Sequence, residues 1–425
     1  MKKLKTSFLS RSMNLVKMVA SAQASDLKER VLNLEGANLI KEKVLLATKL
    51  TEKMSELRGA FLKVGQLLSL DAGDFLPPEA VEILQKLQKD VEPIDFEIIN
   101  KQLQNELKEK FHELVIEKNP LAVASIGQIH IAHYKAHDIV LKVQYPGIKE
   151  TIPSDIKMLR FMLNQWSFIF KKSINFDLLL NELEQTLLTE TDYTIEAKNL
   201  IKARDIFQKD QRFLVPGIYP ELCTVKILAM EKMPGLTLSE WLKKNPSRSD
   251  KEEIGKNLVE LYLLEFFTFG FVQTDPNPGN FLVTDDKKIV LLDFGATKEY
   301  DKVFRDQYLS LLKAAYENDN EKILSLSHEF NLISPLESQK TKDLYCKMMG
   351  FTIEPFRIDR PFSFANREYS QESKDNVINY MKSCQYSPPP QNILFLHRKL
   401  GGVFQFLKQM DVSINLNHYW LNNIL

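Results

Sequence analysis

Residues 273–283 limit the possible folds more than any other segment, because their sequence, QTDPNPGNFLV, combines two prolines with a carboxylate and a carboxamide. Pro276, Pro278 and Gly279 are incompatible with a regular helix, since proline lacks a backbone donor and clashes with the preceding turn. Two short apolar runs follow, FLV and KIVLL, with polar turn residues between them. This pattern predicts a rigid, irregular loop that leads into a β-hairpin.

The loop and the hairpin carry three oxygen-bearing side chains at a spacing that suggests phosphoryl transfer. Asp275 lies five residues before Asn280, and Asp293 follows thirteen residues after Asn280 in an Asp-Phe-Gly sequence. This order matches kinase catalytic and metal-binding loops, and Mg²⁺ prefers oxygen ligands. We predict that Asn280 and Asp293 bind Mg²⁺ and that Asp275 is the base or orients the nucleophile. The structural alternative is a capped hairpin with polar turn residues.

A lysine inside an apolar strand provides the expected phosphate contact. Lys142 lies in IVLKVQY, where its charge needs a partner. The segment LLTETDYTIEAKNL offers Glu190, Asp192 and Glu196. On a regular helix Asp192 and Glu196 share a face, whereas Glu190 points elsewhere. We predict that Glu196 pairs with Lys142. An edge-strand lysine and a solvated acidic helix face are the alternatives.

The order of elements predicts an α+β fold. Expected are helices over 26–90 and 97–111, strands over 113–148, helices over 153–207, a strand over 224–235, helices over 238–270, then the hairpin and helices to the end. Ser249 is the expected N-cap of the helix that follows it. The predicted domains are an N-terminal helical extension over 1–95, a small lobe over 96–235 and a helical lobe over 236–425.

Composition restricts the partners and the compartment. The 425-residue chain has a formal net charge of zero, which gives no indication of a nucleic-acid partner. Its three cysteines are far apart and favour a reducing, cytoplasmic compartment. No run of 18 apolar residues exists. The basic N-terminus is a solvated tail or an interfacial helix, so peripheral contact with the inner membrane stays open. The composition leaves the oligomeric state open.

Beyond these residues, the chain from about residue 55 to 420 resembles the UbiB/ADCK family of atypical kinase-like proteins. The family's KxGQ motif resembles LKVGQLLS, its alanine-rich nucleotide loop resembles AVASIGQIH, and its ExD motif resembles ETDYTIEA. VLKVQYPGI, DPNPGN, DFG and LHRKLGG match further family motifs. The positions concerned are Lys63, Gly65 and Gln66 in the first motif, Ala122, Val123, Ala124 and Ser125 in the second, and Glu190 and Asp192 in the third.

The resemblance implies a bilobal protein-kinase-like fold with an N-terminal helical extension and inserted helices in the small lobe. It implies ATP and Mg²⁺ as cofactors and a role in ubiquinone or other isoprenoid-quinone synthesis. The KxGQ residues are expected to meet the ExD carboxylates and gate the site. Met230, Glu231 and Met233, at the link between the lobes, are expected beside the adenine. The predicted activity is ATP hydrolysis or phosphorylation of a small lipid-related molecule, with a quinone-precursor lipid as a partner.

Some positions depart from the family pattern. Gln273 and Asn277 stand where histidines are usual, and Val123 replaces an alanine. No Ala-Pro-Glu follows the Asp-Phe-Gly sequence, so a loop that docks a peptide is missing. The departures at Gln273 and Asn277 keep a catalytically weak, nucleotide-switched scaffold open as an alternative function, and a conventional protein kinase is the second alternative.

Two groups of basic residues were assigned structural positions. His130, His133 and His137 are expected to be surface or turn histidines rather than metal ligands, because no acidic or cysteine ligand accompanies them at matched geometry. The segment His397-Arg398-Lys399 is expected to have a structural role inside the helical lobe, with head-group binding as the alternative.

Overall fold

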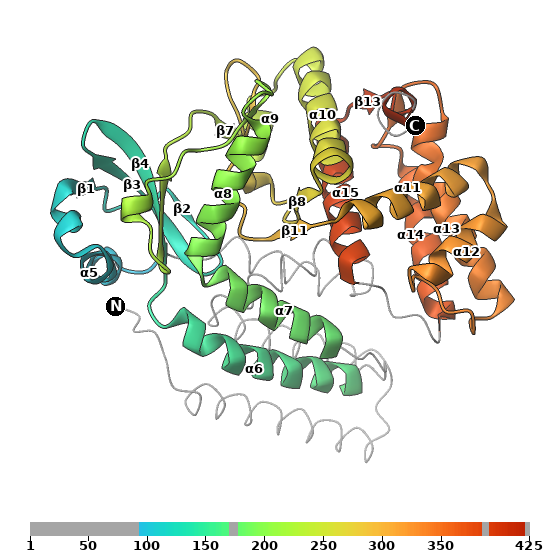
Figure 1. Ribbon diagram of the computed structural model, residues 1–425, viewed down its shortest axis with the longest axis horizontal. Coiled ribbons are helices and arrows are strands. Elements are labelled where there is room, and N and C mark those ends of the chain that lie inside the picture. Colours follow the sequence, from blue (N-terminus) through green and yellow to red (C-terminus); the bar gives the residue numbers. More distant parts are fainter. Residues whose placement is uncertain (1–92, 170–176, 385–390, 421–425) are drawn as a thin grey trace, which may run out of the picture. The chain divides into compact units, whose positions relative to one another are not determined.

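The computed structural model of the chain describes residues 93–169, 177–384 and 391–420 (Figure 1). The chain divides into two compact units. Unit 1 comprises Met1–Lys198 and Ile218–Lys232, and unit 2 comprises Asn199–Gly217 and Met233–Leu425. The predicted helices over 26–90 lie outside the described residues, and so do the KxGQ residues Lys63, Gly65 and Gln66.

Unit 1 contains an antiparallel sheet of five strands. Its order is β1-β3-β4-β6, and the short strand β2 pairs with β3. The bounds are β1 Leu114–Ile116, β2 Ala122–Val123, β3 Gly127–Tyr134, β4 His137–Gln144 and β6 Ile227–Glu231. In β4 the alternation of the strand places Leu141 and Val143 on one face and Lys142 on the other. The central position of β4 buries all of its last six residues, so that Lys142 lies inside the unit.

The helices of unit 1 precede the sheet or interrupt it. They are α5 Phe96–Leu107, α6 Ile148–Ile169, α7 Asp177–Glu190 and the first residues of α8 Tyr193–Phe207. Helices α6 and α7 lie side by side (Figure 1). The α5 helix begins at a cap in which the Asp95 side chain accepts a hydrogen bond from the backbone N–H of Glu97.

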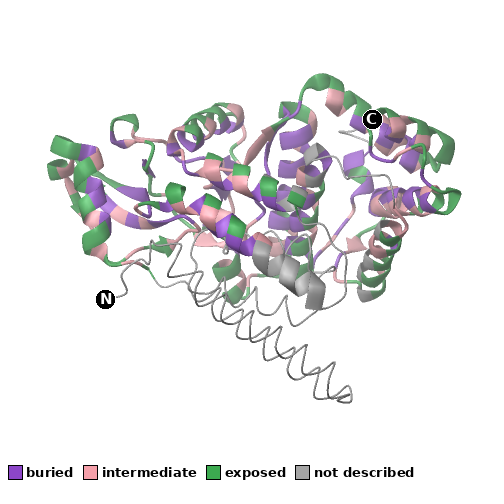
Figure 2. Cartoon of the chain, turned by 90° about the horizontal axis from the view of Figure 1, so that it is seen from below, coloured by how far each residue is buried: buried purple, intermediate pink, exposed green. Residues whose placement is uncertain are grey.

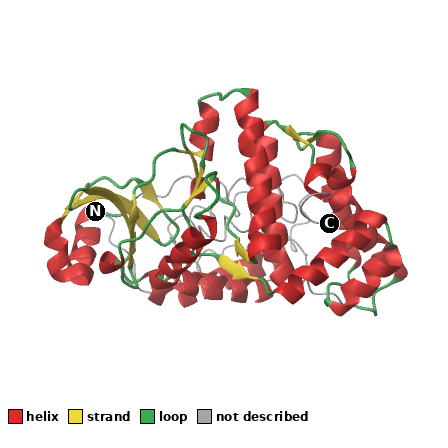
Figure 3. Cartoon of the chain, turned by 45° about the horizontal axis from the view of Figure 1, so that its top comes forward, coloured by secondary structure: helices red, strands yellow, loops and turns green. Residues whose placement is uncertain are grey.

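Unit 2 contains, in its described residues, three small sheets among helices (Figure 3). One sheet has the order β5-β10-β9-β7, a second pairs β8 with β11, and a third pairs β12 Phe362–Ser363 with β13 Ser413–Ile414. The bounds are β5 Phe213–Leu214, β7 Leu236–Thr237, β8 Phe271–Gln273, β9 Phe281–Val283, β10 Ile289–Leu291 and β11 Thr297–Glu299. Strands β9 and β10 form the predicted hairpin, with Phe281 opposite Leu291. Between β8 and β9, the segment Pro278–Asn280 forms a single 3-10 turn rather than an α-helix.

The helices of unit 2 supply most of its core. They are α9 Leu238–Lys243, α10 Arg248–Leu263, α11 Lys302–Glu317, α12 Asn320–Glu329, α13 Gln339–Arg357, α14 Arg367–Ser383, α15 Gln391–Met410 and α16 Asn417–Tyr419. Helix α15 packs along α10 (Figure 1). The buried positions of each unit are purple in Figure 2, and among the apolar ones in unit 2 are Leu258, Phe281, Phe294 and Phe406.

The prediction that Ser249 caps a helix was wrong by two residues. Ser247 is the N-cap of α10, and its Oγ accepts a hydrogen bond of 3.1 Å from the backbone N–H of Asp250. The Ser247 hydroxyl also donates to the Asp250 carboxylate at 2.7 Å. The Ser247 side chain is therefore bonded to both the backbone and the side chain of the third helical residue, whereas Ser249 already lies inside the helix.

Candidate functional site

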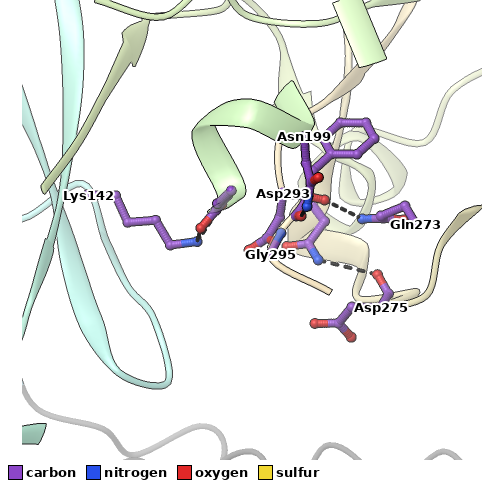
Figure 4. A network of polar contacts seen from close by, with 9 residues as sticks. Lys142, Asn199, Gln273, Asp275, Asp293 and Gly295 are labelled. Atoms are coloured by element: carbon purple, nitrogen blue, oxygen red, sulfur yellow. Dashed lines mark hydrogen bonds and ion pairs between the residues drawn. The ribbon is translucent and has the colours of Figure 1, made fainter. Parts of the chain in front are cut away.

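In unit 1 the central feature is a buried ion pair between Lys142 and Glu196. The Lys142 Nζ donates to both carboxylate oxygens of Glu196, at 2.8 and 2.9 Å. The side chains are only 9% and 4% exposed, respectively. The aromatic ring of Tyr193 also lies beneath the ammonium, with its centroid 5.2 Å from Nζ. Figure 4 shows Lys142 extending from its strand toward this contact.

Helical structure is interrupted between α7 and α8, and this interruption places Glu196 in the first turn of α8. The segment 187–200 is not one regular helix, because α7 ends at Glu190 and α8 begins at Tyr193. Asp192 lies between them and accepts hydrogen bonds from the backbone N–H and the hydroxyl of Thr194, at 3.0 and 2.6 Å. The expectation that Asp192 and Glu196 share one helical face was therefore wrong, since Asp192 precedes the helix and starts it.

The predicted nucleotide loop is a tight turn between β2 and β3. Ala122 and Val123 pair with Ile129 and Gln128, and the backbone N–H of Ala124 donates to the Gly127 carbonyl at 2.9 Å. Ser125 lies within the turn that this bond closes and is half-buried. A Cβ atom at Gly127 would lie 2.3 Å from the backbone oxygen of Val143, so only glycine permits this approach of the two strands.

The predicted adenine neighbours lie where the chain passes from unit 1 to unit 2. Met230 is buried in β6 opposite Val140, and Glu231 is the exposed last residue of that strand. Met233 is the first residue of unit 2 after the crossing and is half-buried.

In unit 2 the hairpin brings Asn280 and Asp293 to the same end of β9 and β10. Asn280 directly precedes β9, and its carbonyl accepts a hydrogen bond of 3.0 Å from the backbone N–H of Leu292. Asp293 is the next residue after this bond, and its Oδ1 accepts from the Gly295 N–H at 2.9 Å. One carboxylate and one carboxamide at a hairpin end supply the hard oxygen donors that Mg²⁺ requires, so the residues present fit this ion.

Asp275 is held in the loop by contacts on its backbone and on its side chain. The Asn280 Nδ2 donates to the Asp275 carbonyl at 3.3 Å (Figure 4). The carboxylate is buried and lies 3.8 Å from the guanidinium of Arg398 on α15. The loop therefore links the predicted base to a predicted metal ligand through one hydrogen bond.

The two departures from the family pattern have clear structural positions. Gln273 donates from Nε2 to the backbone carbonyl of Asp293 at 2.9 Å (Figure 4). Asn277 caps the 3-10 turn by accepting from the Gly279 N–H at 2.9 Å. Both positions therefore contribute hydrogen bonds to the loop without an imidazole.

Several polar residues that support this loop had not been predicted from the sequence. The Asn199 Nδ2 donates to the Phe294 carbonyl at 3.0 Å and to the Thr297 hydroxyl at 2.8 Å. Lys399, which was assigned only a structural role in the helical lobe, donates to the Gln273 Oε1 at 2.9 Å and pairs with Glu265 at 2.9 Å. Burial raises the pKa of the Glu265 carboxyl, while Lys399 acts in the opposite direction. The one sequence signal for this role was the adjacent basic residues Arg398 and Lys399 in LHRKLGG, which lie in an otherwise mostly apolar segment.

The three clustered histidines have different environments. His130 is fully buried, so the expectation of a surface or turn histidine was wrong for this residue. Its Nδ1 lies 2.9 Å from the Glu117 carbonyl and its Nε2 lies 2.9 Å from the Gln128 amide nitrogen. This pattern assigns a neutral ring that donates from Nδ1, and burial lowers its pKa. His133 contacts Asp138 at the surface, and His137 is exposed at the start of β4.

Neither a metal-binding cluster of acidic, histidine or cysteine side chains nor a membrane-spanning helix is present among the described residues. No group of three or more histidine, cysteine, aspartate or glutamate side chains in those ranges is arranged to hold a metal ion. None of the helices that can be described there has both the length and the apolar character needed to cross a bilayer.

A lysine–glutamate pair in a sheet-containing unit and a D-x-x-x-x-N loop with Asp-Phe-Gly in a helical unit define a protein-kinase-like chain of the atypical class. Residues 86–327 match the ABC1 atypical kinase-like domain. The chain belongs to this family, which confirms the UbiB/ADCK resemblance, the α+β kinase-like fold and the ATP-dependent atypical kinase class.

Curated relatives and a solved structure agree with this assignment. The mitochondrial atypical kinase COQ8 of Saccharomyces cerevisiae is 35% identical over 375 residues, which are 86% of this chain and 74% of the yeast protein. The probable serine/threonine-protein kinase abkA of Dictyostelium discoideum is 31% identical over 400 residues, 88% of this chain and 70% of that protein. The structure of Rv3197 from Mycobacterium tuberculosis with erythromycin shares the fold, with a TM-score of 0.62, 23% identity and coverage of 91% of this chain and 97% of the other.

Proposed function

We propose that the chain binds ATP with Mg²⁺ and hydrolyses it or transfers its terminal phosphoryl group to a small lipid-related acceptor. The observation that carries this proposal is the Lys142–Glu196 pair, whose side chains are 9% and 4% exposed. Removing two charges from water is costly, so a buried pair is weak evidence for a stabilising role. A cation held rigidly by a carboxylate is, however, what an ATP phosphate requires in a kinase.

Each predicted residue has a role in this proposal. Lys142 neutralises phosphate oxygens, and Glu196 holds its ammonium in place. Asn280 and Asp293 hold Mg²⁺, which would supply charge neutralisation at the phosphates. Asp275 accepts the proton of the attacking hydroxyl or orients a water molecule.

The acceptor and the setting follow from the family. Relatives named COQ8 and the UbiB resemblance support a role in ubiquinone synthesis, with a quinone-precursor lipid as the molecule acted on. Peripheral contact with an inner membrane is part of the proposal, and several relatives are named as mitochondrial proteins. The proposed domains stay at 1–95, 96–235 and 236–425, with Lys63 and Gln66 of the first domain gating the site against Glu190 and Asp192.

The proposal is tested by measuring ATP hydrolysis with and without anionic liposomes and a quinone-precursor mimic. Asp293→Asn removes the carboxylate at one end of the hairpin. Asp285→Asn makes the same change at an exposed position in the turn at the other end and is the matched control. We expect hydrolysis by the wild type and by Asp285→Asn, with a loss of roughly 100-fold or more in Asp293→Asn.

The alternatives give different results in the same experiment. A nucleotide-switched scaffold would bind Mg-ATP without turnover, even when lipid is present. A conventional protein kinase would transfer phosphate to protein substrates in a manner that Asp275→Asn abolishes. Equal hydrolysis by the wild type and by Asp293→Asn would contradict the assignment of the metal ligands.

A further inference from the structure

Helix α15 supplies a buried lysine to the back of the predicted catalytic loop. The Lys399 side chain is 1% exposed, and so is the side chain of its partner Glu265. The Lys399 Nζ lies 2.9 Å from the Glu265 carboxylate, 2.9 Å from the Gln273 Oε1 and 5.3 Å from the centroid of the Phe281 ring. These three partners come from the π-helical segment Leu264–Phe269 that follows α10, from β8 and from β9.

Burial of an ammonium at this position is costly unless its donors are satisfied. Desolvation of an ion costs several kcal/mol, and a buried pair commonly stabilises a fold no better than apolar residues of similar volume. The pair with Glu265 offsets the charge, but the bond to Gln273 is not needed for charge balance. The bond to Gln273 satisfies a second donor of the ammonium, and it also constrains the amide that accepts it.

The bond from Lys399 determines which way the Gln273 amide faces. A lysine ammonium has only donors, so the group of Gln273 that faces it must be the carbonyl oxygen. The amide nitrogen is then directed to the other side, where it donates to the backbone carbonyl of Asp293 at 2.9 Å. Without this lysine, only the bond to the Asp293 carbonyl would hold the amide in this orientation.

The same helix makes two further contacts with the loop. Arg398 lies 3.8 Å from the carboxylate of Asp275. A Cβ atom at Gly402 would lie 2.1 Å from the Cβ of Pro276, so a side chain at this position would displace the proline. Arg398 and Gly402 are four residues apart and share one face of α15. Contacts of α15 therefore extend over Gln273, Asp275 and Pro276.

We propose that Lys399 is a positioning residue for Asp293 and acts through the amide of Gln273. This inference rests on the proposed function, in which Asp293 holds Mg²⁺. Lys399 touches neither nucleotide nor metal in this scheme. It fixes the amide orientation, the amide fixes the Asp293 backbone, and the backbone fixes the carboxylate that accepts from the Gly295 N–H at 2.9 Å.

The test compares the Mg²⁺ dependence of ATP hydrolysis in two variants. Gln273→Glu keeps an acceptor for Lys399 but removes the donor to the Asp293 carbonyl, with almost no change in shape. Lys399→Met removes the ammonium and leaves the amide without its fixed orientation. Lys408→Met alters an exposed lysine on the same helix and is the control. Loss of a residue that supports a metal ligand commonly lowers metal affinity about 10–100-fold.

We expect both variants to raise the Mg²⁺ concentration for half-maximal hydrolysis at least about tenfold. Binding of ATP without Mg²⁺ should stay within about twofold of the wild type, which a general loss of structure would not allow. Thermal unfolding shows whether the Lys399→Met protein folds. If it does not fold, the Mg²⁺ requirement of Gln273→Glu alone tests the inference. An unchanged Mg²⁺ requirement in folded Gln273→Glu would overturn the inference.

Failure of this inference can be distinguished from failure of the proposed function. If Asp293→Asn abolishes Mg²⁺-dependent hydrolysis while Gln273→Glu does not alter the Mg²⁺ requirement, only the role of Lys399 is refuted. If the wild type shows no Mg²⁺-dependent binding or hydrolysis of ATP, both the proposed function and this inference are refuted.

Discussion

Replacement of Glu196 by alanine should destabilise unit 1 strongly, because the carboxylate contacts an ammonium that is almost inaccessible to water. Both oxygens lie within 2.9 Å of the Lys142 Nζ. Removing one partner of such a pair costs about 3–5 kcal/mol. Loss of the ammonium proton gives little relief, since neutralising a lysine at pH 7 costs about 4–5 kcal/mol. Both estimates therefore place the effect near 4 kcal/mol.

Hydrogen–deuterium exchange of peptides that cover β3 and β4 measures this effect within unit 1. A change of about 4 kcal/mol corresponds to exchange that is faster by roughly two to three powers of ten. The double variant Lys142→Met with Glu196→Leu removes both charges, and it should recover most of the protection because apolar residues can replace a buried pair.

An exposed pair in the same unit provides the control. Lys226 and Glu106 lie 2.9 Å apart, and the lysine side chain is 51% exposed. Glu106→Ala should cost less than about 1 kcal/mol, since water already solvates these charges. If Glu196→Ala and Glu106→Ala changed exchange equally, or if the double variant were less stable than Glu196→Ala, the reasoning from burial would be refuted.

Three further predictions concern single positions. Gly127→Ala should cost about 1–3 kcal/mol in urea unfolding and weaken ATP binding, because the new methyl meets the Val143 backbone oxygen at 2.3 Å. Lowering the pH from 7 to 5 should reduce the thermal stability of the wild type more than that of His130→Gln. Burial lowers the pKa of His130 from its ordinary value of 6.5, so below pH 6.5 the unfolded chain binds a proton that the folded chain does not, and stability falls. Gly402→Ala should lower ATP hydrolysis about tenfold or more, since the methyl displaces Pro276; unchanged hydrolysis would show that α15 does not position the loop.

The sequence predicted those parts of the fold and site that local patterns determine. Alternating apolar residues gave β4 and the hairpin, and the fixed loop spacing placed Asn280 and Asp293 at one hairpin end. The pairing of Glu196 with Lys142 was predicted even though the break before its helix was not, because charge pairing limited the choice to three carboxylates.

Contacts between residues far apart in sequence could not be predicted in the same way. Lys399 and Gln273 are 126 positions apart, and no periodicity or spacing connects them. The break between Glu190 and Tyr193 also had no clear signal, since both flanking segments are good helix formers and the side chain of Asp192 decides where the second begins. His130 was misjudged although the alternation of β3 places it on the buried face with Gln128 and Ala132; the Gln128 amide and the Glu117 carbonyl then satisfy its ring nitrogens.

The separation between Lys399 and Gln273 has a consequence for how the protein is made. Ribosomes add about 5–20 residues per second, so a gap of 126 positions delays the arrival of the lysine by roughly 6–25 seconds. During this interval the nascent chain already contains the segment from Gln273 to Asp293, but it lacks the ammonium that orients the amide. If Lys399 has the proposed positioning role, a chain that stalls before this residue lacks that constraint on the Gln273 amide, and we expect it to need more Mg²⁺ for ATP hydrolysis.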